Sequence, residues 1–260
     1  MIVFARNPKA LAEGKPVPHI LNSAYNDLLD FLGPEFQPLW CSSDDTKGEE
    51  DRKSYFSNEA FINNTMVFSY QSIGLMQQGI HRPYFARILQ QCADRGAVTL
   101  LDVGSGAGQL GLAFHALGFH VSLADVLSRS MLFAEWRLRK HGLDTIPIFE
   151  LDQNANWFPP VPPHQIVTCF DVLEHLEPAV QKRLLAWMGE IGGLVFANLI
   201  IDDSHPGMHL PIDVDDLVAY VQKKWQAELS DYYPGKDNKP RQHLLIYGSG
   251  VSYPDVTPTE

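Results

Sequence analysis

The feature that most constrains the fold is a buried strand that runs directly into a glycine-rich turn. Residues 98–103 are aliphatic or β-branched except for Asp102, a composition typical of a strand inside a sheet. Gly104, Gly106 and Gly108 follow at every second position. These glycines let the backbone turn sharply and let a ligand approach without a β-carbon in the way, and the helix that starts there presents unpaired N–H groups. We therefore expect a nucleotide-like ligand at this turn.

From residue 97 onward, short β-rich runs alternate with stretches of helical spacing, which is the pattern of βαβ units and a parallel sheet. The expected strands are 98–103, 120–124, 145–149, 165–170 and 193–199. The expected helices lie between them, at 107–117, 127–141, 178–190 and 212–225. A turn-rich segment separates two final strands, 227–232 and 243–247. The chain should therefore form a doubly wound, mostly parallel α/β sheet of seven strands with an antiparallel last strand.

The N-terminal part of the chain has a different texture and is expected to form a helical region over residues 1–95. Apolar residues recur at helical spacing within 20–32. A second helix is expected between Pro83 and Gly96, since proline favours a helix start and glycine a helix end. The resulting division places a helical lid or substrate-binding region before a ligand-binding domain over residues 96–260.

Composition narrows the class of partner. A formal charge of −11 argues against a protein that holds nucleic acid through phosphate neutralisation, so the expected partner is a small-molecule substrate. The three cysteines lack metal-ligand spacing and are odd in number, which argues against a structural zinc site and a disulfide framework. No apolar segment qualifies as a signal peptide or membrane span, which predicts a cytoplasmic protein without a membrane partner. Monomer and homodimer both remain open.

Two carboxylates narrow the class of ligand. Asp125 ends the second expected strand, seventeen residues after Gly108, where a carboxylate can accept both hydroxyl hydrogens of a ribose. Dinucleotide sites also use that position. Asp102 argues against a dinucleotide, because it lies directly before the glycines, and a negative charge there would repel a pyrophosphate. A ligand with an amino group and a positive charge would be attracted there.

Four motifs in this order resemble those of the class I S-adenosylmethionine-dependent methyltransferases, in particular the group related to the ubiquinone and menaquinone biosynthesis methyltransferases. The motifs are Leu-Asp-Val-Gly-Ser-Gly-Ala-Gly (101–108), Ala-Asp-Val-Leu-Ser-Arg-Ser-Met-Leu-Phe-Ala (124–134), Leu-Asp-Gln-Asn (151–154) and Phe-Asp-Val-Leu-Glu-His-Leu (170–176). The resemblance covers residues 98–200 well and residues 200–260 only in outline. It implies S-adenosyl-L-methionine as the cofactor.

The resemblance also implies a set of cofactor-binding residues: Asp102, Gly104, Ser105, Gly106, Gly108, Asp125, Val126, Asp152, Gln153, Phe170 and Asp171. The glycine turn would lie along the methionine moiety, Asp125 would hold the ribose, and Val126 would pack on the adenine. Asp152 would face the adenine amino group. Phe170 and Asp171 would border the methionine end and the substrate. Taken alone, either Asp125 or Asp152 could equally be a helix cap or turn residue.

Catalytic and substrate-binding candidates follow the fourth and fifth strands. The catalytic candidates are His175 and its neighbour Glu174, and His175 could remove a proton from an attacking hydroxyl or amine. A local structural hydrogen bond is the alternative, since many methyl transfers depend on alignment and need no base. His205, His209 and, in the N-terminal region, Tyr70 are substrate-binding candidates.

No metal site is expected. Asp202 and Asp203 lie near His205 and His209, but Pro206-Gly207 prevents a helix that would align the two imidazoles, and no fixed ligand spacing is matched.

The sequence therefore predicts an enzyme that methylates oxygen or nitrogen of a small metabolite. One alternative keeps the cofactor but uses it for a non-methyl transfer such as intramolecular alkylation. A nicotinamide-dependent dehydrogenase and a catalytically silent subunit of the same fold are further alternatives. The identity of the acceptor cannot be derived, because substrate pockets of this kind are built from variable segments.

Overall fold

The computed structural model describes residues 23–32, 82–152, 154–201, 209–234 and 240–248. The helices are α3 (Ala24–Leu32), α6 (Arg82–Arg95), α7 (Gln109–Ala116), α8 (Arg129–Lys140), α9 (Pro178–Ile191) and α10 (Val214–Gln222), with a short 3-10 helix η1 (Leu173–His175). The strands are β1 (Thr99–Val103), β2 (His120–Val126), β3 (Ile148–Leu151), β4 (His164–Cys169), β5 (Gly192–Ile200), β6 (Gln226–Pro234) and β7 (Pro240–Gly248).

The strands form one sheet in the order β3-β2-β1-β4-β5-β7-β6. The first five strands pair in parallel, and β7 runs antiparallel to both of its neighbours, β5 and β6. This arrangement confirms the predicted doubly wound sheet of seven strands. Because β1 lies between β2 and β4, the chain reverses its direction of travel across the sheet at β1, which is where such folds open a crevice for a ligand.

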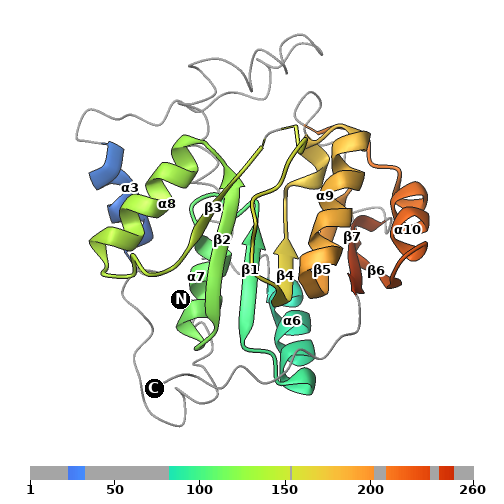
Figure 1. The fold of residues 1–260 in the computed structure, drawn as a ribbon, viewed down its shortest axis with the longest axis horizontal. Helices are drawn as coiled ribbons and strands as arrows, with labels where there is room; N and C mark the ends of the chain where they lie inside the picture. Colours follow the sequence, from blue (N-terminus) through green and yellow to red (C-terminus); the bar gives the residue numbers. More distant parts are fainter. Residues whose placement is uncertain (1–22, 33–81, 153, 202–208, 235–239, 249–260) are drawn as a thin grey trace.

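Helices cover both faces of the sheet (Figure 1). On one face, α6 and α7 bury Ile88 and Phe114 against apolar residues of β1, β2 and β4. On the other, α9 and α10 bury Leu185 and Val221 against a second set of side chains from the same strands. Because successive side chains of a strand point to opposite faces of the sheet, each of these strands contributes to two separate cores.

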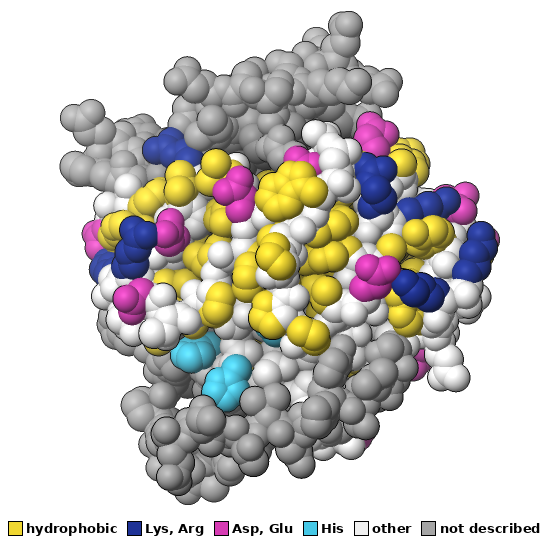
Figure 2. Space-filling view, in the orientation of Figure 1, with side chains coloured by type: hydrophobic (Ala, Val, Ile, Leu, Met, Phe, Trp, Pro, Cys, Tyr) yellow, Lys and Arg dark blue, Asp and Glu magenta, His cyan; other side chains and the backbone are white. Residues whose placement is uncertain are grey.

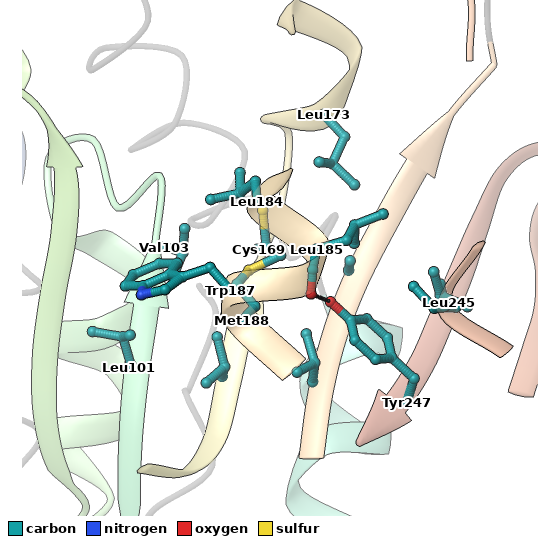
Figure 3. Packing of buried hydrophobic residues seen from close by; sticks show 14 of the residues in the cluster. Leu101, Val103, Cys169, Leu173, Leu184, Leu185, Trp187, Met188, Leu245 and Tyr247 are labelled. Carbon is teal, nitrogen blue, oxygen red and sulfur yellow. Dashed lines mark hydrogen bonds between the residues drawn. The ribbon is translucent and has the colours of Figure 1, made fainter. Parts of the chain in front are cut away.

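Figure 3 shows part of the second core, where α9 crosses the strands. Val103, Cys169 and Leu173 pack there beside Met188, and all four are almost fully buried. The hydroxyl of Tyr247 donates a hydrogen bond of 2.6 Å to the Leu185 carbonyl, which gives the phenol a partner inside an apolar environment. This core holds the carboxyl ends of β1 and β4 at a fixed spacing.

Several boundaries differ from the sequence predictions for identifiable reasons. The third strand begins at Ile148 and not at residue 145, because Pro147 has no N–H to donate to the sheet, although its carbonyl accepts a hydrogen bond from Leu123 N at 2.9 Å. The first helix after the glycine turn begins at Gln109 and not at residue 107, because Gly108 is in the left-handed conformation with φ 73°.

The connection from β3 to β4 contains no helix among its described residues, 152 and 154–163. Phe158 of this connection stacks on Trp187 of α9, with ring centroids 4.6 Å apart and an interplanar angle of 6°. Arg183 also donates hydrogen bonds to two carbonyls of the connection, those of Asn154 and Ala155. Figure 2 shows apolar side chains gathered across the middle of this face of the molecule. The proline-rich connection is thus packed onto α9.

A buried charged cluster fastens α3 to α8. Asp27 is 1% exposed and accepts from Lys140 Nζ at 2.8 Å, while its other oxygen lies 2.8 Å from His141 Nε2 and 2.7 Å from Ser23 Oγ. Arg137, fully buried, places its Nε 3.5 Å from Asp27 and donates through Nη1 to the Ala107 carbonyl at 3.0 Å. Burial acts to raise the pKa of Asp27, but its hydrogen bonds outweigh this and lower it. The cluster therefore connects α3, α8 and the residue next to Gly106.

Within the described ranges, no helix combines the length and the apolar character needed to cross a membrane.

Candidate functional site

The glycine turn lies at the carboxyl edge of the sheet, between two neighbouring strands. Val103, the last residue of β1, is level with Ala124 on one side and with Cys169 on the other. The residues that follow each of these positions, Asp125 and Phe170, therefore flank the turn. This is the predicted site, and it lies at the position where the order of the strands reverses.

The turn depends on glycine at three positions with left-handed backbone. Gly104, Gly106 and Gly108 have φ values of 70°, 51° and 73°. Gly104 N donates to the Ala124 carbonyl at 2.8 Å, and Gly108 N closes the turn onto the Ser105 carbonyl at 2.7 Å. A β-carbon at Gly104 would lie 2.1 Å from Val172 Cγ2, whereas one at Gly106 would meet no atom of the described residues within 4 Å. Gly104 thus permits close packing within the protein, and Gly106 faces space that no described residue fills.

Asp125 is held in place by two backbone amides. Its Oδ2 accepts from Gly106 N at 2.5 Å, and its Oδ1 accepts from Val126 N at 2.7 Å. Burial raises the pKa of this carboxyl to about 6, and the two backbone hydrogen bonds counteract that rise only in part. Because a carboxylate oxygen has two lone pairs, each oxygen can accept one further hydrogen bond. The carboxylate is therefore positioned to accept two hydroxyls at once.

Asp102 lies beneath the turn and does not face outward. Its side chain is 3% exposed, and its two oxygens accept from Gly111 N at 3.0 Å and from Thr168 Oγ1 at 2.9 Å. Burial raises its pKa to about 7, and the nearby charge of Asp125 adds to the rise. Because protein groups already hydrogen-bond to both of its oxygens, Asp102 would act on the amino group of a ligand by electrostatic attraction across the turn and not by direct contact.

Asp152 takes part in a local turn. Its Oδ2 accepts from Asn156 N at 2.8 Å, and its carbonyl accepts from Ala155 N at 2.9 Å. The turn role that the sequence left open is thus present, and contact with an adenine stays a prediction. Val126 and Phe170 are partly buried at the same edge, each packed against a core cluster. Gln153 lies outside the described residues.

The backbone after β4 is strained and clamped. Asp171 has φ 57°, a value that residues with a β-carbon rarely adopt. Asn198, fully buried in β5, accepts from Asp171 N at 2.8 Å and donates to Asp171 Oδ1 at 2.6 Å. Strain of this kind is concentrated at functional sites. Sequence reasoning missed Asn198, although a lone amide within the apolar strand Gly192–Ile200 was the available signal.

Three of the predicted residues come together beyond β4 and β5. Glu174 is 1% exposed, and its Oε1 lies 3.8 Å from Nε2 of His175. The His209 ring lies edge-on to His175, with centroids 5.2 Å apart at 68°. Burial raises the pKa of Glu174 well above its usual range, and the charge of Asp171 adds to this. The other substrate-binding candidates, Tyr70 and His205, fall outside the described residues.

No protein-family model and no curated protein matches this chain. Solved structures do. A S-adenosylmethionine-dependent methyltransferase from Clostridium acetobutylicum ATCC 824 is 12% identical with a TM-score of 0.54, over 70% of this chain and 99% of that one. PigF, solved with SAH, is 13% identical with a TM-score of 0.56, over 93% and 72%. An O-methyltransferase family protein from Burkholderia thailandensis is 12% identical with a TM-score of 0.55, over 89% and 72%.

At these identities the similarity shows the fold, which is that of the class I methyltransferases, as predicted. The narrower resemblance to the ubiquinone and menaquinone group stays a prediction, because no sequence match supports it.

Proposed function

We propose that this chain is an S-adenosyl-L-methionine-dependent methyltransferase that transfers a methyl group to oxygen or nitrogen of a small-molecule metabolite. The observation that carries the proposal is the geometry of Asp125, fixed by two amides beside a turn whose central glycine faces space that no described residue fills. Two solved proteins of the same fold, from Clostridium acetobutylicum and Burkholderia thailandensis, are named as methyltransferases, and a third, PigF, was solved with SAH. A small acceptor and a cytoplasmic setting belong to the same proposal, as does an assembly no larger than a homodimer.

The residues present fit this cofactor. A ribose needs a paired acceptor, which Asp125 supplies, and an amino-acid tail needs a close backbone approach, which the space beside Gly106 allows. Burial raises the pKa of Asp102 to about 7, so this carboxyl under the turn is partly ionised near neutral pH. Its ionised form would attract an ammonium group and disfavour a pyrophosphate, which argues against the dehydrogenase alternative.

The chemistry assigned to the protein is mainly alignment. When bound, the cofactor supplies an electrophilic methyl group on a sulfonium. Asp125 and the glycine turn orient it, while the clamped backbone at Asp171 fixes the wall beside its methionine end. Alignment of nucleophile and methyl group accounts for much of the acceleration in such a displacement. His175 belongs to η1, which follows β4, and on this proposal it would accept a proton from the acceptor.

The N-terminal region contributes to the proposed substrate side. Ala24 and Leu28 of α3 pack against Ala107, which is part of the glycine turn. In contrast, α6 packs onto the sheet through Ile88 and Cys92. We infer that residues 1–95 border the acceptor and that α6 anchors this region on the sheet.

Asp125→Ala is expected to weaken binding of S-adenosylhomocysteine about tenfold or more, since it removes hydrogen bonds to a charged group. Isothermal titration calorimetry measures this directly. Glu150→Ala is the matched control, because Glu150 lies opposite Asp125 on β3 and is exposed. The control should bind like the unchanged protein. Equal affinity in the Asp125 variant would contradict the ribose assignment.

Binding of S-adenosylhomocysteine should also depend on pH. The pKa of Asp125 is about 6, so its carboxylate is largely ionised at pH 8 and about one-tenth ionised at pH 5. If the ionised form accepts the ribose hydroxyls, affinity should fall about tenfold from pH 8 to pH 5. Calorimetry at both values tests this, and the Asp125→Ala variant should lose that part of the dependence. A wild-type affinity that is flat over this range would argue against the carboxylate as acceptor.

Incubation with S-adenosylmethionine alone separates methyl transfer from the non-methyl alternative. The proposal expects S-adenosylhomocysteine only when an acceptor is added. Methylthioadenosine formed without any acceptor would favour intramolecular alkylation instead.

A further inference from the structure

Three side chains with metal-binding atoms converge beyond the carboxyl ends of β4 and β5. Glu174, His175 and His209 each bring one such atom within 4.8 Å of the other two. Glu174 and His175 belong to η1, which follows β4, whereas His209 lies beyond β5. Because these strands are parallel neighbours, the cluster lies at the same edge of the sheet as the glycine turn.

The backbone around the cluster is held in place. Leu210 N donates to the Glu174 carbonyl at 2.6 Å and so attaches the His209 segment to η1. The buried amide of Gln181 donates to the Leu173 and Leu176 carbonyls, both at 2.9 Å. The backbones that carry the three side chains are therefore fixed relative to one another before any ligand binds.

Glu174 is the member of the cluster that most needs a partner. It is 1% exposed, and its Oε2 has no hydrogen-bond partner among the described residues. Its Oε1 lies 3.8 Å from His175 Nε2, which is too far for a hydrogen bond. A buried carboxyl oxygen without a partner is costly, and a bound ion is one of the few arrangements that removes the cost.

We propose that Glu174, His175 and His209 bind a divalent first-row metal ion such as Zn²⁺ or Mn²⁺. One carboxylate and two imidazoles are a ligand set that suits these ions, and three protein ligands leave a position open for another molecule. Metal–ligand bonds of about 2.0–2.2 Å place neighbouring ligand atoms about 3.0–3.5 Å apart, so the side chains would close by roughly 1 Å around the ion.

The open position suggests what the ion does, and this part of the inference rests on the proposed function. An oxygen or nitrogen of the acceptor would bind there, and the ion would favour its deprotonated, nucleophilic form. His175 would then hold the metal rather than remove the proton itself.

The sequence did not predict this site, because its third ligand lies 34 residues after His175. Short, fixed spacings are what identify a metal site in a sequence. Only the parallel pairing of β4 and β5 brings the two segments together. The expectation of no metal considered His209 with Asp202, Asp203 and His205, and not with Glu174.

Metal binding can be measured without any assay of activity. Tag-free protein is freed of metal by chelator and titrated with ZnCl₂ or MnCl₂ in a calorimeter, and Co²⁺ is added separately to record visible absorption. One ion per chain is expected to bind. Glu174→Gln and His209→Ala should each weaken binding at least tenfold and change the Co²⁺ spectrum. His120→Ala is the matched control, since it removes an exposed imidazole at the start of β2, and it should bind like the unchanged protein.

Absence of stoichiometric binding, or binding that is unchanged in both Glu174→Gln and His209→Ala, would overturn the proposal. Circular dichroism melts identify a variant that fails to fold, and the remaining variant then decides. Titration with S-adenosylhomocysteine in the presence of chelator separates the two proposals. Cofactor binding without metal binding overturns only the metal site, whereas metal binding without cofactor binding overturns only the proposed function.

Discussion

Replacement of Gly104 by alanine is expected to lower the free energy of unfolding by about 2 to 5 kcal/mol, through backbone strain and steric overlap together. Gly104 has φ 70°, which costs a residue with a β-carbon free energy. The new β-carbon would also lie 2.1 Å from Cγ2 of Val172, a β-branched side chain with little freedom to move aside. Either the turn or the segment after β4 must therefore shift.

Gly106→Ala is the matched control for this effect. Gly106 has φ 51°, so the strain is similar, but its β-carbon would meet no atom of the described residues within 4 Å. We expect a loss of only about 1–2 kcal/mol in stability, the cost of the left-handed backbone. Binding of S-adenosylhomocysteine should fall strongly in this variant, because the methyl group enters the space assigned to the ligand.

Urea denaturation of the two single variants and of the double variant Gly104→Ala/Val172→Ala tests the cause. Removal of the Val172 methyl groups should return part of the stability lost in Gly104→Ala. If the two glycine variants lose the same stability, or if the double variant is no more stable than Gly104→Ala, contact with Val172 is not the reason for glycine at this position.

Asp27→Ala is expected to destabilise the protein by about 3–5 kcal/mol, because it removes a buried carboxylate that lies 3.5 Å from the buried guanidinium of Arg137. Asp30→Ala is the matched control. Asp30 contacts the same Lys140 but is exposed, so its loss should cost no more than about 1 kcal/mol. Thermal or urea unfolding measures both. Equal effects would show that the cluster contributes no more than a surface ion pair.

The contribution of Asp27 should also depend on pH. Its pKa is lower in the folded state than in the unfolded state, so its stabilising effect is present above the ordinary aspartate pKa and is lost as pH falls through the folded value. The difference between Asp27→Ala and the unchanged protein should therefore be largest near neutral pH and shrink in acid.

The fold was largely predictable because most of its parallel strands are short apolar runs that alternate with helical stretches. Each strand of the sheet was expected within a few residues, and the glycine turn located the ligand edge. The strand β3 starts later than predicted because Pro147 has no N–H to donate to the neighbouring strand. The prediction from residue composition did not take this local effect into account.

The site was predictable only where its residues lie on consecutive strands that belong to a recognisable motif. Asp125 lies next to the glycine turn because strands β1 and β2 are paired, as motif spacing implied. The Asn198 clamp on Asp171 and the approach of His209 to Glu174 join segments from different strands. Such contacts depend on side-chain packing across the sheet, which a single sequence does not reveal.

The position of β7 between β5 and β6 has a consequence for synthesis on the ribosome. The edge of β5 that faces away from β4 receives its partner only from β7, residues 240–248, which are made well after β5. Until those residues leave the exit tunnel, a fully buried nine-residue strand has one unpaired edge, and β6 has no neighbour at all. The nascent chain must therefore keep this unpaired edge away from other molecules until β7 has been synthesised.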